Sequence, residues 1–240
     1  MLAMPAPTPY DLRFRLLGIP VAVHPLFWVV TALMGFSESP AHTGLWIACV
    51  FASILVHEFG HGLMGKALGA RPRVALYWMG GLCASDRERT PIQSVVVLLA
   101  GPGAGFLLYG LVLALGPAAL HAVPADRPRL IERVEDVLNM LEQINLYWGL
   151  INLLPIWPLD GGQIAGIALT AANRWHGMRW THILGLVLGG VAAAYLFSRE
   201  QRPTAFLFAY LAFGNFQAMQ AERARGWSDD SRDPADWWKG

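Results

Sequence analysis

Apolar residues gather along this chain in six long runs that are separated by short polar segments. The first run lies between Arg15 and Glu38 and contains no Asp, Glu, Lys or Arg. Because a helix needs about 20 apolar residues to cross the hydrocarbon core of a bilayer, each run predicts one membrane span. The other five predicted spans are about 44–66, 91–116, 137–157, 180–198 and 203–220.

A shorter apolar segment lies between the second and third of these runs. It extends from Val74 to Leu82, contains Gly80-Gly81 and is followed by the charged residues Asp86 to Arg89. The pattern predicts a short strand or hairpin, either re-entrant or at the membrane surface. We therefore expect an all-α membrane protein of about six transmembrane helices, with this β segment between the second and third.

Composition supports a membrane protein and excludes two other classes. Only 15% of the 240 residues are charged and 55% are hydrophobic, whereas about 25% of a typical soluble domain is charged. The chain is too apolar to be disordered. Its net charge of +1, without any basic run, excludes the electrostatic footprint of a nucleic-acid-binding protein.

The distribution of positive charge predicts the orientation. Most of the 18 Lys and Arg residues fall in segments on the same side as the N-terminus. Since cytoplasmic loops carry an excess of Lys and Arg, we expect a multi-pass protein of the plasma (inner) membrane with both termini in the cytoplasm. Residues 1–220 would form a single integral membrane domain, and residues 221–240 a polar cytoplasmic tail.

The predicted second span contains the ionisable sequence His57-Glu58-Phe59-Gly60-His61. At 3.6 residues per turn, the two histidines lie on one helix face, where both imidazoles can reach one metal ion. Glu58 lies about 100° round the helix from His57, close enough to act on a metal-bound water. A chance match is harder to accept here than in a soluble protein, because each such residue costs about 2–3 kcal/mol at the bilayer centre.

A catalytic zinc site usually has three protein ligands, so a third is expected elsewhere. Met64 and Ala67 replace the glycine and histidine that an HExxHxxGxxH motif would need, which excludes that subclass. The remaining intramembrane candidate is Asp160, which follows Pro155 and Pro158. Because both prolines should break the fourth span, the chain can turn inward there, and Asp160 would complete a His, His, Asp set.

HEFGH together with NLLPIWPLDGG resembles the site-2 protease family of intramembrane zinc metalloproteases (peptidase family M50), in a short form without a PDZ or CBS domain. Asn152, Pro155, Asp160 and Gly161 match the family motif NxxPxxxxDG position by position. The resemblance covers roughly residues 12–170.

This resemblance implies one Zn²⁺ per chain, held by His57, His61 and Asp160, with Glu58 as the general base. It implies an intramembrane zinc metalloendopeptidase that hydrolyses peptide bonds in or near transmembrane segments of other membrane proteins. The partners would then be a membrane-protein substrate, the lipid bilayer and an unidentified regulatory protein. Asn152 could donate a hydrogen bond to the developing oxyanion or to the substrate, or it could join two helices instead.

A substrate-pairing strand is a further hypothesis. If Val74, Ala75, Leu76, Tyr77 and Trp78 form an exposed edge strand, an unwound substrate could pair with it in extended form.

Two polar residues and one other function remain as alternatives. His24 could line an aqueous entry or support the site, or it could bond to a neighbouring backbone; for Asn145 a helix-to-helix hydrogen bond is favoured. The alternative function is a non-proteolytic relative that binds metal or substrates. Glu58 favours hydrolysis, because a transport or structural site has no need of a base. A di-iron hydroxylase is disfavoured, since His57 and His61 form the only cluster among seven histidines.

Overall fold

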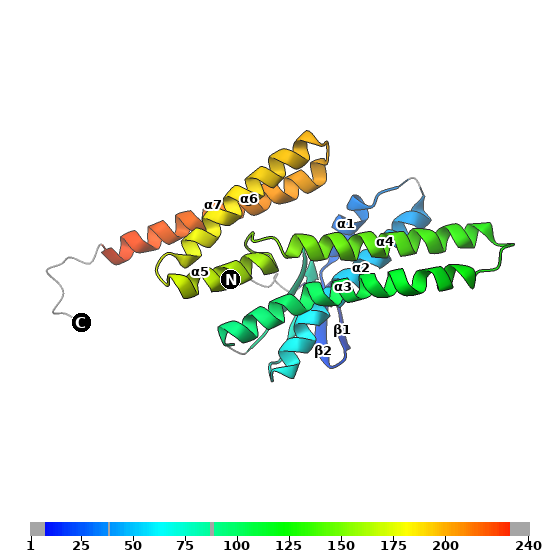
Figure 1. Ribbon diagram of the computed structural model, residues 1–240, viewed down its shortest axis with the longest axis horizontal. Coiled ribbons are helices and arrows are strands. Elements are labelled where there is room, and N and C mark those ends of the chain that lie inside the picture. The colour runs from blue at the N-terminus through cyan, green and yellow to red at the C-terminus, as the bar shows by residue number, and fades with distance from the viewer. Residues whose placement is uncertain (1–7, 38, 87–88, 231–240) are drawn as a thin grey trace. The chain divides into compact units, whose positions relative to one another are not determined.

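The computed structural model describes residues 8–37, 39–86 and 89–230, with the backbone alone for 223–230. Over these residues the chain is mostly helical with one small sheet (Figure 1), and it divides into two compact units after Asn152. The elements are β1 (Leu12–Leu16), β2 (Ile19–Val23), α1 (Pro25–Met34), α2 (Pro40–Ala67), β3 (Arg73–Tyr77), β4 (Gly80–Ala84), α3 (Pro91–His121), α4 (Pro128–Asn152), α5 (Asp160–Ala172), α6 (Gly177–Ser198) and α7 (Arg202–Asp230).

The predicted first span is wrong as one continuous helix. Its beginning forms the hairpin β1–β2, which turns at Leu17 and Gly18 with φ of +50° and +78°. Only the ten residues of α1 are helical, and ten residues cannot cross a bilayer core that requires about 20. Hydropathy alone does not separate a buried strand from a helix, so a strand and a short helix in series look like one span.

The four strands form one sheet of order β1-β2-β3-β4 in the N-terminal unit. β1 and β2 are antiparallel, β2 and β3 parallel, and β3 and β4 antiparallel. Alternate residues of β2 and β3, including Val21, Val23 and Leu76, are buried in a core with Ile54 and Phe59 of α2. The sheet therefore packs against the helix that carries the HEFGH sequence.

The hairpin predicted from Val74 to Leu82 is confirmed as β3–β4, but its use as an exposed edge is not. β3 is an inner strand: Val74 pairs with Val21 of β2 and with Cys83 of β4. Trp78 lies beyond its end. Because both hydrogen-bonding sides of β3 are occupied, it cannot accept a substrate strand, and that prediction is wrong.

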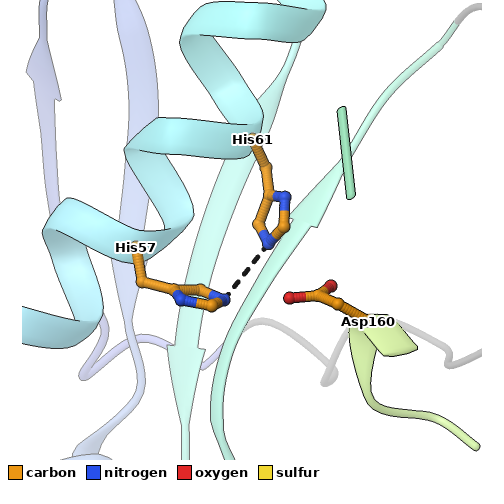
Figure 2. A group of neighbouring side chains, drawn as sticks. All are labelled: His57, His61 and Asp160. Carbon is orange, nitrogen blue, oxygen red and sulfur yellow. Dashed lines mark hydrogen bonds between the residues drawn. The ribbon is translucent and has the colours of Figure 1, made fainter. Parts of the chain in front are cut away.

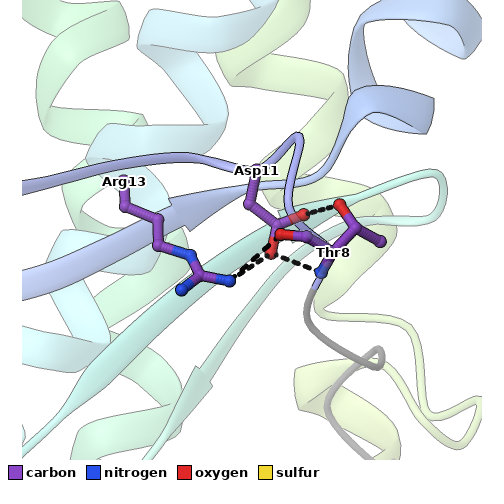
Figure 3. A network of polar contacts seen from close by, with 3 residues as sticks. All are labelled: Thr8, Asp11 and Arg13. Atoms are coloured by element: carbon purple, nitrogen blue, oxygen red, sulfur yellow. Dashed lines mark hydrogen bonds and ion pairs between the residues drawn. The ribbon is translucent and has the colours of Figure 1, made fainter.

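A small polar network precedes β1 (Figure 3). The backbone N–H and the hydroxyl of Thr8 donate to the two carboxylate oxygens of Asp11, at 3.0 and 2.5 Å. The Arg13 guanidinium donates to Asp11 and to the Thr8 carbonyl oxygen. These contacts lie outside the apolar helices and hold the start of the sheet.

α2 and α3 are the long apolar helices of the N-terminal unit. The Ser39 hydroxyl accepts a hydrogen bond from His42 N–H at the start of α2, and Thr90 and Gln93 form a capping box on α3. Gly60 lies against the Ala100 carbonyl, where a Cβ would overlap the backbone, so the two helices approach closely. Such small residues are typical of membrane helix contacts.

Among the described residues, three helices are long and apolar enough to cross a membrane: α2, α3 and α6. α4 ends at Asn152, just before Pro155, as the two prolines predict. In the C-terminal unit, α6 packs along α7, with Gly189 against Ala212. The predicted tail begins inside α7, and residues 231–240 lie outside the described part of the chain.

Candidate metal centre

His57 and His61 lie one helical turn apart on α2, and both side chains are buried. Their Nε2 atoms are 3.2 Å apart, and the ring planes make an angle of 81°. Two nitrogen ligands at about 2.0–2.1 Å from a tetrahedral zinc ion would be about 3.3–3.4 Å apart. The pair therefore already has the spacing that one zinc ion requires.

α3 fixes which nitrogen of His61 can bind a metal. Nδ1 of His61 lies 2.7 Å from the carbonyl oxygen of Val97, which can only accept a hydrogen bond. Nδ1 must therefore carry the proton, which leaves the Nε2 lone pair for a metal. Gly101 lies against the same ring, where an added Cβ would overlap it. A backbone carbonyl and a missing side chain together set the orientation of this imidazole.

Glu58 is also buried, and it contacts a different element. Its carboxylate lies against Gly81 of β4, where an added Cβ would overlap Oε1 and Cγ. Gly81 pairs with Leu76 of the inner strand β3, so its position is fixed by the sheet. The strand therefore provides the space that the Glu58 carboxylate occupies beside the two histidines.

Asp160 is the first residue of α5 and is buried. A carboxylate in the first turn of a helix is stabilised by the unpaired N–H groups there. A Cβ at Gly161 or Gly162 would overlap backbone atoms of Leu153 or Ile156, so only glycine allows the chain to fold back this closely.

Figure 2 draws the three predicted ligands: His57 and His61 belong to α2 in the N-terminal unit, and Asp160 begins α5 in the C-terminal unit. Two imidazoles and one carboxylate are a donor set that zinc accepts.

The loop before Asp160 is held by hydrogen bonds that the sequence did not reveal. Leu159 N–H donates to the Ile156 carbonyl, and the Gln163 side chain donates to the Pro158 carbonyl at 3.1 Å. These acceptors are backbone atoms, so no residue type signals them. The glycine pairs at 80–81 and 161–162 were the available signal, since glycine often marks a close approach.

The remaining candidates have structural contacts. Nδ2 of Asn145 donates to Ser53 of α2 at 2.9 Å, which confirms the favoured helix-to-helix bond. Nδ2 of Asn152 donates to the Trp148 carbonyl of its own helix. Nδ1 of His24 accepts from Leu26 N–H and caps α1. Bonding to neighbouring backbone was one of the two alternatives for His24.

Comparisons with known proteins agree with this site. The profile of peptidase family M50 matches residues 116–183, which include the Asn152 to Gly162 motif. The protein sll0528 of Synechocystis sp., named as a candidate zinc metalloprotease, is 31% identical over 62% of this chain and 41% of its own. Zinc metalloprotease MJ0392 of Methanocaldococcus jannaschii is 28% identical over 65% and 44%. The chain thus spans less than half the length of these two relatives.

A solved structure shares the fold. The site-2 protease from Methanocaldococcus jannaschii superposes with a TM-score of 0.63 at 22% identity, over 88% of this chain and 95% of that one. The profile match, the two relatives and this shared fold agree with the two motifs read from the sequence. The match over residues 116–183 makes the chain similar to peptidase family M50, and the solved structure shows that it shares the fold of a site-2 protease.

Proposed function

We propose that this protein is a zinc metalloendopeptidase that hydrolyses peptide bonds in or near the membrane-spanning segments of other membrane proteins. The observation that carries the proposal is in α2, where two buried Nε2 atoms lie 3.2 Å apart and the Glu58 carboxylate is buried beside them. A structural or transport site needs the metal ligands, but it does not need a carboxylate such as Glu58 to act as a base. The zinc metalloprotease names of the relatives agree.

In this proposal His57, His61 and Asp160 hold one zinc ion. The spacing of the two nitrogens, the fixed tautomer of His61 and the donor set support the assignment. When bound, zinc supplies a Lewis acid that polarises a carbonyl group and lowers the pKa of water.

Glu58 then acts as the general base and acid. Its carboxylate takes a proton from the attacking water, whose oxygen bonds to the peptide carbonyl carbon. When the C–N bond breaks, Glu58 returns the proton to the leaving amine. Asn152 carries a second amide hydrogen besides the one donated to Trp148, and this hydrogen could stabilise the developing oxyanion.

A reconstitution experiment tests this function. The purified protein in liposomes is mixed with candidate membrane substrates, and cleavage and zinc content are measured together. We expect Glu58→Gln to keep about one zinc per chain and to lose cleavage by about 10²–10⁴-fold, the usual contribution of a general base. Chelation of the zinc should abolish cleavage in the unaltered protein.

The matched control is Glu132→Gln, the same change at an exposed position of α4. It should cleave as fast as the unaltered protein. Equal cleavage by the Glu58→Gln protein would disprove the mechanism and leave a metal-binding protein without protease activity.

The membrane arrangement is a proposal as well. We infer a multi-pass protein of the plasma membrane with both termini in the cytoplasm, in one membrane domain over residues 1–220. Most Lys and Arg residues lie in segments on the same side as the N-terminus, which supports this orientation. Fusion of a cytoplasm-specific reporter at residue 123 and at the C-terminus should give signal only at the C-terminus.

A further inference from the structure

Asn215 of α7 connects the last two helices to the loop that precedes Asp160. Its side chain is 1% exposed. Nδ2 donates to the Trp157 carbonyl at 2.6 Å and to the Leu211 carbonyl at 2.8 Å. Oδ1 lies 3.1 Å from Nδ1 of His182 on α6. One amide thus joins α6, α7 and the loop within the C-terminal unit.

The partners define the orientation of this amide. Two carbonyl oxygens can only accept, so the atom that faces both of them must be the nitrogen. Oδ1 then faces His182, and Nδ1 of His182 must donate. Every donor and acceptor group of the amide is used, and a fully satisfied buried network of this kind is rigid.

α6 leaves just enough space for this network. A Cβ at Gly185 would lie 2.6 to 2.9 Å from the side-chain atoms of Asn215, closer than real contacts allow. The His182 ring also meets the Trp157 indole edge to face, with 5.9 Å between ring centroids. Gly185 and His182 therefore both constrain the Asn215 amide, and His182 also contacts the loop residue Trp157.

The position of Trp157 bears directly on Asp160, three residues later. Between them, Leu159 N–H bonds to the Ile156 carbonyl and the Gln163 side chain to the Pro158 carbonyl. The loop is therefore short and internally bonded, so a displacement of the Trp157 carbonyl shifts the start of α5. Through its hydrogen bond to the Trp157 carbonyl, Asn215 of α7 can set that position.

We propose that Asn215, oriented by His182 and accommodated by Gly185, is a positioning residue that holds Asp160 in place to bind zinc. This inference rests on the proposed function, in which Asp160 is a ligand. Residues that orient metal ligands typically contribute about 10–100-fold to metal affinity. Because Asn215 acts through the loop, we expect the lower end of that range.

The test measures how fast the zinc-loaded protein in detergent releases zinc to an excess of chelator. Asn215→Leu removes the amide, and Gly185→Ala leaves the amide but displaces it. We expect both variants to release zinc about tenfold faster than the unaltered protein. Thermal unfolding of each variant shows whether it is folded.

Two other glycines of α6 provide matched controls for Gly185→Ala. A Cβ at Gly190 meets nothing within 4 Å, so Gly190→Ala should behave as the unaltered protein. A Cβ at Gly189 meets Ala212 and Phe208 of α7 at 3.2–3.3 Å but not Asn215. Gly189→Ala should therefore lower Tm through helix packing without faster release of zinc.

The outcomes separate this inference from the proposed function. Unchanged zinc release in Asn215→Leu and Gly185→Ala would overturn the inference, and so would equally fast release in Gly189→Ala, because helix packing alone would then explain it. Asp160→Ala tests the function: it should lose zinc far faster than any of these variants. If Asp160→Ala keeps zinc as the unaltered protein does, the ligand assignment is wrong and the inference falls with it.

Discussion

In α2, helix geometry places three polar side chains, whereas at the start of α5 an irregular loop places a single carboxylate. His57 and His61 share a face because they are four residues apart. Gly101 of α3 leaves space for the His61 ring, and Gly81 of β4 leaves space for the Glu58 carboxylate. The loop before Asp160 is held instead by hydrogen bonds to its backbone carbonyls. The first region should therefore be sensitive to added volume, and the second to lost hydrogen bonds.

Volume added beside His61 should have the largest effect, because it should remove both zinc and cleavage. Gly101→Ala places a methyl group where the His61 ring lies, and overpacking of this kind costs about 1–3 kcal/mol of stability. The ring must move, and misplacement of about 1 Å can cost about 100-fold in activity. We expect loss of both zinc and cleavage, measured by metal analysis and by cleavage in liposomes.

Gly103→Ala is the control for this change. A Cβ at Gly103, two residues later on α3, meets nothing within 4 Å. Zinc content and cleavage should therefore stay at the level of the unaltered protein. If Gly101→Ala behaved like Gly103→Ala, steric fit would not be what holds His61.

A second change separates the base from the ligands. Gly81→Ala places a methyl group against the Glu58 carboxylate. We expect cleavage to fall by about 10²–10⁴-fold, as for loss of a general base, while zinc is retained. In a Glu58→Gln background the same change should cost nothing further. A loss of zinc in Gly81→Ala would show that β4 supports the ligands as well as the base.

The loop should respond to a lost hydrogen bond by a smaller amount. Gln163→Leu removes the donor to the Pro158 carbonyl, and one such bond is worth about 0.5–1.5 kcal/mol. We expect a lower Tm and a release of zinc a few-fold faster. Gln143→Leu, at an exposed position of α4, should change neither. If Gln163→Leu matched that control, hydrogen bonds within the loop would not position Asp160.

Much of the α2 region could be predicted because its information is local. Four-residue spacing on a helix brings His57 and His61 together whatever surrounds them. The β1–β2 hairpin was missed because its buried alternate residues merge with α1 into one apolar run. The contact between Asn215 and Trp157 joins residues 58 positions apart through a backbone carbonyl. No local pattern encodes such a pair, so the means by which Asp160 is held became apparent only from the fold.

The smallest effect should come from Asp11, whose carboxylate is held by hydrogen bonds in the segment before β1. The Thr8 hydroxyl, with Arg13 beside it, keeps the pKa of Asp11 below its ordinary value. A lowered folded-state pKa stabilises the protein above the unfolded-state pKa, and this contribution is lost as the pH falls through the folded value. Asp11→Asn should therefore lower Tm slightly near neutral pH, with the difference vanishing in acid.

Thermal unfolding of the zinc-free protein from about pH 7 down to about pH 3 measures this difference. The zinc-free protein is used because acid would protonate the metal ligands of the loaded protein and release its zinc. Thr8→Val should shrink the difference by removing the hydroxyl. Zinc release should be unchanged in both variants, because neither side chain is bonded to the loop or to α2. A faster release would mean that hydrogen bonds anywhere in the chain, and not those of the loop alone, influence the metal ligands.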